Sequence, residues 1–199
     1  MTGWLVVGLG NPGSTYANTR HNVGFMVAEE LARRARVSFS APRGMRADVA
    51  TTRLTAAGLG MPGIEAHRIV LVKPRTFMNA SGEAVGRLSR FYDIPASRVI
   101  AIHDELDLDL GQLRLKRGGG DNGHNGLRSL RAHLGTGDYL RVRYGIGRPP
   151  GRQDAADYVL APIPSALRTE IELETGRAAD AVEHLISDGL ETAQNRYNS

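Results

Sequence analysis

The chain has 199 residues, enough for one large domain or two small ones, and its 41% hydrophobic and 23% charged residues are ordinary for a globular protein. It has no cysteine, which excludes a disulfide framework, a thiolate nucleophile and cysteine-ligated zinc, and suits a reducing compartment. No apolar run reaches the ~18 residues that cross a bilayer, and no basic segment precedes the first apolar run, so we expect a cytoplasmic protein without membrane contact.

The net charge of +4 is distributed unevenly along the chain. Residues 111–152 carry 9 basic and 2 acidic side chains, whereas residues 153–199 carry 3 and 9. A segment this basic predicts a face that binds a polyanion. The alternative is a solvated face that happens to be basic.

The first strand is expected at Trp4–Leu9, where consecutive Leu and Val residues are typical of a strand buried on both faces. Helical periodicity begins only at Val23, with Thr19 or Asn22 as a possible N-cap. Open α/β folds bind ligands beyond the carboxyl ends of their strands. Three polar side chains follow this strand end: Asn11, Tyr16 and His21.

Gly8–Gly13 formally matches the dinucleotide fingerprint G-x-G-x-x-G. That motif requires a helix N-terminus directly after the glycines, but a polar run, residues 14–20, intervenes here. The acidic residues about 20 positions further on, Glu29 and Glu30, fall inside the expected helix instead of at a second strand end. A nicotinamide or flavin enzyme is therefore the disfavoured alternative.

Further strands and helices alternate along the chain. Strands are expected at 46–54, 68–74, 98–103, 113–116 and 139–147, and helices through 85–92, from Asn125 to Gly135, and over 165–188 up to Gly189. This alternation predicts a single α/β domain over residues 1–199, with a mixed, mostly parallel twisted sheet surrounded by helices. Residues 149–164, which begin with Pro149-Pro150-Gly151, are expected to form a mobile lid.

His21 is the leading candidate for a general base, because neutral imidazole is the common side chain that accepts protons near pH 7. The chain has five other histidines, and most lone histidines are structural. His21 stands out because it follows a glycine-rich loop and because Asp104 comes at another strand tip. A carboxylate on the far ring nitrogen would fix the tautomer and stabilise the imidazolium. Asp104 could equally be a helix cap or a turn residue.

No G-x-S-x-G elbow and no H-E-x-x-H motif is present, so the sequence indicates neither a serine nucleophile nor zinc. If His21 is a base, water is the expected nucleophile. Asn11, Asn79 and Asn125 fall in loops at three strand ends. Asparagine is common in turns, but three that converge would suit a peptide backbone or a developing oxyanion.

Four ordered segments, VVGLGNPGSTYANTRHNVGF, KPRTFMNASG, HDELD and GGGDNGHNGL, resemble the bacterial peptidyl-tRNA hydrolase family. The resemblance extends over essentially the whole chain, including RVRYGIGRPPG. It implies a monomeric esterase that needs no metal or cofactor and no obligate protein partner. Such an enzyme cleaves the ester between a peptide and the 3′ ribose of tRNA, which recycles tRNA from stalled translation.

The resemblance also implies roles for individual residues. His21 matches the catalytic base, Asp104 its orienting carboxylate, and Asn11 the residue that screens the amino end of the substrate. Positions that hold the acceptor end and the peptide are matched by Tyr16, Phe77, Asn79 and Asn125. Lys116 and Arg143 match a clamp on tRNA phosphate. Departures are small: Arg114 replaces a usual lysine, Asp121-Asn122 fill a variable pair, and the loop at 58–63 is slightly long.

A third possibility is a non-catalytic RNA-binding module that uses the basic segment. It does not explain the pairing of His21 with Asp104 or the three asparagine loops. Loss of His21 would leave the activity of such a module intact.

Overall fold

The computed structural model describes residues 3–198; Met1, Thr2 and Ser199, which the predicted domain also includes, lie outside the described residues. Its seven-stranded sheet has the order β3-β2-β4-β1-β5-β7-β6. The strands are β1 (Gly3–Gly8), β2 (Ala47–Thr55), β3 (Gly58–Leu59), β4 (His67–Pro74), β5 (Val99–Glu105), β6 (Leu113–Arg117) and β7 (Leu140–Gly145).

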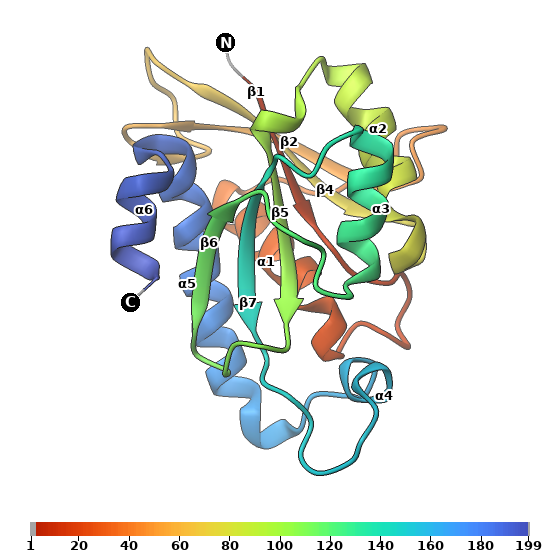
Figure 1. The fold of residues 1–199 in the computed structure, drawn as a ribbon. Coiled ribbons are helices and arrows are strands. Elements are labelled where there is room, and N and C mark those ends of the chain that lie inside the picture. Colours follow the sequence, from red (N-terminus) through yellow and green to blue (C-terminus); the bar gives the residue numbers. More distant parts are fainter. Residues whose placement is uncertain (1–2, 199) are drawn as a thin grey trace.

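The four central strands, β4, β1, β5 and β7, are parallel to one another, and the outer strands pair antiparallel. The predicted mixed sheet is confirmed. Three of the central strands, β4, β1 and β5, contain continuous apolar runs, whereas arginines alternate with apolar residues in β7. Both faces of these strands are covered, as is usual for parallel sheets. All four carboxyl ends therefore lie at one edge of the sheet (Figure 1).

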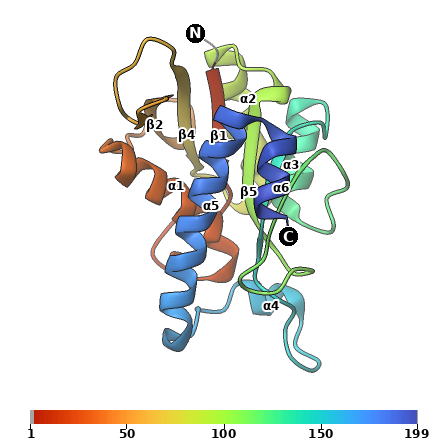
Figure 2. The ribbon, with the colours of Figure 1, turned by 90° about the vertical axis from the view of Figure 1, so that its left-hand side faces the viewer.

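Helices cover the sheet on both faces (Figures 1 and 2). On one face α1 (Val23–Ala35) and α5 (Arg168–Asp188) pack on a core that includes Val6, Ile100 and Val142. On the other, α2 (Ser81–Tyr92) and α3 (Asn125–Leu134) cover a second core that includes Val7 and Val70. Short 3-10 turns are η1 (Arg20–Asn22), η2 (Met78–Ala80), η3 (Ala96–Arg98) and η4 (Ser165–Leu167).

The C-terminal region differs from the expectation of one helix over 165–188. It consists of η4, α5 and a further helix, α6 (Leu190–Tyr197), after Gly189, whose φ is 86°. The sequence pattern did not indicate α6, because the helix is short and buries only Ala193 and Tyr197 against the core.

The free edge of the sheet at β6 is covered by the end of the chain. The Asn198 side chain accepts from the Leu115 backbone N–H at 2.7 Å and donates to the Leu115 carbonyl at 3.0 Å. It therefore satisfies both outward backbone groups of one edge-strand residue, as a neighbouring strand would.

The predicted lid, residues 149–164, contains the short helix α4 (Ala155–Val159), which lies beyond the strand ends (Figure 1). Its two sides are attached to the body: the Tyr158 hydroxyl donates to the Ile146 carbonyl at 2.9 Å, and the Ile163 N–H donates to the Asn18 carbonyl at 2.8 Å. The mobility of this segment stays a prediction. Across residues 3–198, no helix combines the length and the apolar character needed to span a membrane.

Candidate active site

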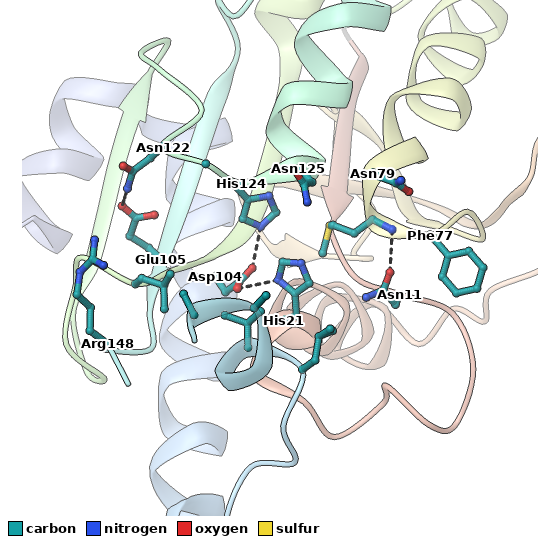
Figure 3. A pocket seen from close by; sticks show the side chains of 17 residues that line it. Asn11, His21, Phe77, Asn79, Asp104, Glu105, Asn122, His124, Asn125 and Arg148 are labelled. Atoms are coloured by element: carbon teal, nitrogen blue, oxygen red, sulfur yellow. Dashed lines mark hydrogen bonds and ion pairs between the residues drawn. The ribbon is translucent and has the colours of Figure 1, made fainter. Parts of the chain in front are cut away.

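A cavity of about 370 Å³ opens at the carboxyl ends of β1, β4 and β5, beneath α4. Side chains from three predicted loops line it, including Asn11, His21, Asn79, Asp104 and Asn125 (Figure 3). Because β4, β1 and β5 are adjacent and parallel, their loops meet at one place although the residues are far apart in the sequence. The expectation that three strand ends meet over one pocket is thus met.

At the centre of the cavity, the Asp104 carboxylate lies between two imidazoles. Its Oδ2 is 2.8 Å from His21 Nδ1, and its Oδ1 is 2.8 Å from His124 Nε2 (Figure 3). Asp104 is 3% exposed and is the second-to-last residue of the buried strand β5, so its position is fixed by the sheet. The structure brings His21 and Asp104 together and adds His124, which the sequence reasoning counted only among the other histidines.

The tautomers of both imidazoles follow from their partners. His124 Nδ1 accepts from the backbone N–H groups of Gly126 and Leu127, at 3.1 and 3.4 Å, and so caps α3. Its proton is therefore on Nε2, which donates to Asp104. The carboxylate likewise draws the His21 proton to Nδ1, which leaves His21 Nε2 as the basic atom. Among the described residues, Nε2 of His21 has no hydrogen-bond partner.

The same assignment speaks against a metal site, although His21, Asp104 and His124 lie close enough to share an ion. A metal ligand must present a deprotonated nitrogen. Nε2 of His124 could do so only if Nδ1 took the proton, and Nδ1 faces two backbone donors. The cluster is instead arranged so that each imidazole donates one N–H to Asp104.

The groups of the site shift the pKa values of one another. Burial lowers the pKa of His21, but the charge and hydrogen bond of Asp104 outweigh it, so the pKa is raised above its ordinary 6.5. Burial raises the pKa of Asp104, yet the two imidazoles hold it well below its usual range. His103 lies behind them with its ring 5.2 Å from that of His124, and burial lowers its pKa to about 3. His103 is therefore neutral.

Asn11 is oriented by two contacts. Its Oδ1 accepts from the Met78 backbone N–H at 2.7 Å, so its Nδ2 points into the cavity (Figure 3). Asn22 holds the Asn11 backbone on both sides, since its side chain accepts from the Asn11 N–H and donates to the Asn11 carbonyl, each at 2.9 Å. Asn22 occupies the N-cap position of α1, as predicted, but it makes no capping hydrogen bond because its side chain is used here. Thr19 precedes η1 instead, and its hydroxyl donates to the Tyr16 carbonyl.

The other predicted residues lie at the rim or outside the cavity. Asn79 and Asn125 are exposed at its mouth. Phe77 is 60% exposed, lines the cavity and packs edge-on against Tyr16, with ring centroids 6.3 Å apart. Tyr16 therefore reaches the site only through Phe77.

Lys116 and Arg143 do not line the cavity but lie behind one of its walls. Arg143 Nη2 donates to Glu105 Oε1 at 2.5 Å, and Glu105 faces the cavity. The same oxygen accepts from Asn122 at 3.0 Å. Lys116 forms no ion pair with any carboxylate in residues 3–198. Sequence reasoning missed Glu105, Asn122 and Arg148, which line this wall. Only their place in the HDELD, glycine-loop and RVRYGIGRPPG segments could have indicated them.

The dinucleotide alternative is overturned by the path of the chain after β1. The chain passes through turns and η1 before α1 begins at Val23, so no helix follows directly after the glycines as the motif requires. Glu29 lies inside α1, where it pairs with Lys73 at 2.9 Å, and not at the end of a second strand as the motif requires. Fold and site together define an α/β enzyme with a histidine–carboxylate centre at its strand ends.

Comparison with known proteins identifies the family. The family described as peptidyl-tRNA hydrolase matches residues 5–199. Peptidyl-tRNA hydrolases of Cutibacterium acnes and Frankia casuarinae are each 57% identical over 196 residues, covering 98% of this chain and 98% and 94% of theirs. A crystal structure of the Acinetobacter baumannii peptidyl-tRNA hydrolase is 35% identical, with a TM-score of 0.84 over 98% of this chain and 94% of that one. The chain belongs to the peptidyl-tRNA hydrolase family.

Proposed function

We propose that this chain hydrolyses the ester between a peptide, or an N-acyl-amino acid, and the 3′ ribose of tRNA, with a water molecule activated by His21 as the nucleophile. Family membership makes it a hydrolase that acts on peptidyl-tRNA. The observation that carries the mechanism is the hydrogen bond from His21 Nδ1 to Asp104, which leaves Nε2 free towards the cavity.

In the proposed reaction, His21 Nε2 takes a proton from water as the water oxygen attacks the ester carbonyl carbon. The carbonyl electrons move to oxygen and form an oxyanion. When they return, the bond to the ribose oxygen breaks, and that oxygen takes the proton from the imidazolium. Asp104 stays ionised throughout and supports the imidazolium, while His124 holds the second carboxylate oxygen in place.

Asn11 is proposed to stabilise the oxyanion or to hold the neighbouring peptide group, because its Nδ2 is a donor that points into the cavity. Asn79 and Asn125 would hold further peptide groups at the mouth of the cavity. Phe77, supported by Tyr16, offers an exposed aromatic face on which a base of the acceptor end can stack.

Lys116 and Arg143 are proposed to bind a tRNA phosphate beside the cavity. Arg143 already holds one anionic oxygen, from Glu105. Lys116 feels the charge of Glu105 but forms no ion pair among the described residues. A phosphate between them would satisfy both cations. The proposal further places the enzyme in the cytoplasm as a monomer that needs no cofactor or protein partner.

The test of this function is ester cleavage of an N-acetyl-aminoacyl-tRNA in the presence of a chelator. We expect release of free tRNA and the N-acetylated amino acid at a rate proportional to enzyme. Binding of the tRNA without cleavage would instead support the RNA-binding alternative.

The pH profile is expected to report the raised pKa of His21. Because the base must be neutral, kcat/KM should rise with pH through a value above 6.5. In Asp104→Asn the raising interactions are lost while burial remains, so the same limb should move to lower pH, with a lower plateau. Asp109→Asn, which changes an exposed carboxylate, is the control and should leave the limb in place. An unshifted limb in Asp104→Asn would contradict the pairing.

Asn11→Asp is expected to reduce discrimination between N-acetylated and free aminoacyl-tRNA. The substitution keeps the acceptor for Met78 N–H but replaces the Nδ2 donor by an anionic oxygen that can compensate an ammonium. In the wild type, burial of that ammonium beside a donor is unfavourable. The measurement is the ratio of kcat/KM for the two substrates. Asn11→Ala should lower activity on the acetylated substrate with little gain on the free one. If the ratio were unchanged in both variants, Asn11 would have no role in discrimination and would be a turn residue only.

A further inference from the structure

Arg141 in β7 is a buried cation without an acidic partner. It is 0% exposed, and arginine is rarely buried to this extent unless it is paired. Within residues 3–198 it forms no ion pair, and its Nε has no hydrogen-bond partner. Its guanidinium lies 4.5 Å from the centre of the Tyr139 ring. Burial lowers the pKa of Arg141, and the charges of Tyr139 and Asp121 offset this only in part.

The donors of Arg141 go to three backbone carbonyls. Nη1 donates to Gly120 at 2.7 Å, and Nη2 donates to Gly119 at 3.0 Å and to Gly137 at 3.1 Å. Gly119, with a φ of 99°, has a backbone conformation that favours glycine. The planar fork of a guanidinium can bind several carbonyls at fixed angles, which an ammonium cannot reproduce.

The loop that Arg141 holds also supports Lys116. Lys116 is directly opposite Arg141 in the ladder between β6 and β7, an arrangement of like charges that is unfavourable by itself. The Lys116 ammonium packs on Gly119 so closely that a Cβ at Gly119 would be 2.6 Å from Nζ. Burial lowers the pKa of Lys116, and the charges of Arg143 and Arg141 lower it further.

We propose that Arg141 is a positioning residue for substrate phosphate: its fork fixes the Gly119–Gly120 backbone, against which the Lys116 ammonium is held. Arg141, Lys116 and Arg143 form a cation cluster. Among the described residues, the only ion pair made by this cluster is that of Arg143 with Glu105. A phosphate at Lys116 supplies the negative charge that the cluster lacks. The inference rests on the proposed phosphate site at Lys116 and Arg143.

The test is a double-mutant cycle on N-acetyl-aminoacyl-tRNA. Arg141→Lys keeps the charge but loses the fork, and is expected to raise KM about tenfold with kcat nearly unchanged. In a Lys116→Ala background the same substitution should change KM less than about twofold, because the group that Arg141 positions is already gone. Gly119→Ala disturbs the contact with the Lys116 ammonium from the side of the exposed loop. It should also raise KM in the wild type and have little effect on KM in the Lys116→Ala background.

Arg68→Lys is the matched control, since Arg68 Nη2 donates to the Tyr92 carbonyl at 2.9 Å near the start of β4, away from the site. Its KM should equal that of the wild type. If Arg141→Lys raised KM by the same factor with and without Lys116, or lowered kcat alone, the inference would be overturned and Arg141 would be a purely structural residue. If Lys116→Ala itself left KM unchanged, the phosphate site would fail instead, and a wild type that does not cleave would refute the function.

Discussion

Replacement of His21 by alanine is expected to lower kcat by a factor of at least about 10²–10⁴, with little change in KM. The structure leaves no second base at the same place: His124 donates its one proton to Asp104, and its other nitrogen caps α3. Single-turnover cleavage of N-acetyl-aminoacyl-tRNA at saturating enzyme measures the chemical step directly.

The control for this experiment is His133→Ala. His133 is an exposed histidine of α3 whose Nδ1 contacts the Ser129 carbonyl at 2.9 Å, and it does not line the cavity. It should retain full turnover. Near-normal turnover of the His21 variant would remove His21 from the mechanism and favour a non-catalytic role for the cavity.

Gly24→Ala is expected to cause a large loss of stability. Gly24 lies in the first turn of α1, three residues after His21, and a Cβ there would be 2.4 Å from the Ile102 carbonyl oxygen and 2.6 Å from the Leu9 nitrogen. These two atoms form the 3.0 Å hydrogen bond that joins the ends of β1 and β5. Because backbone cannot move aside cheaply, we expect a loss near the upper end of the ~1–3 kcal/mol typical of overpacking. Thermal unfolding should show a lower midpoint, by roughly 2–4 °C per kcal/mol.

Gly176→Ala in the middle of α5 is the matched control. Its Cβ would meet only Arg34 Nη2, at an ordinary 3.7 Å, and alanine is the better helix former. The midpoint should stay unchanged or rise. If Gly24→Ala were equally harmless, α1 would not be held by close backbone contact with the strand ends, and the position of His21 would need another explanation.

The sequence was informative where one local pattern determined the structure. Continuous apolar runs such as 98–103 identified the central parallel strands, and parallel strands bring their ends together. The meeting of His21 with Asp104 followed from that geometry. The long apolar faces of α1 and α3 were equally clear in their helical spacing.

What could not be predicted depends on contacts between distant residues. His124 shares Asp104 because the glycine loop folds back over β5, which no local pattern indicates. Asparagine is a residue type that often caps helices, but the Asn22 side chain binds the Asn11 backbone instead of the helix N–H groups. Arg141 alternates with apolar residues along β7, a pattern that usually marks an exposed face, yet the loop covers it completely.

The contact between Asn198 and β6 bears on the behaviour of the protein at high concentration. An unpaired outer strand offers a template on which another molecule can add, and such strands start domain swapping and fibril growth. Here the carboxamides of Asn198 and Gln194 occupy that template at Leu115, within the strand that also carries Lys116. Asn198 and α6 therefore protect this edge of the sheet, next to the proposed phosphate ligand Lys116, from self-association.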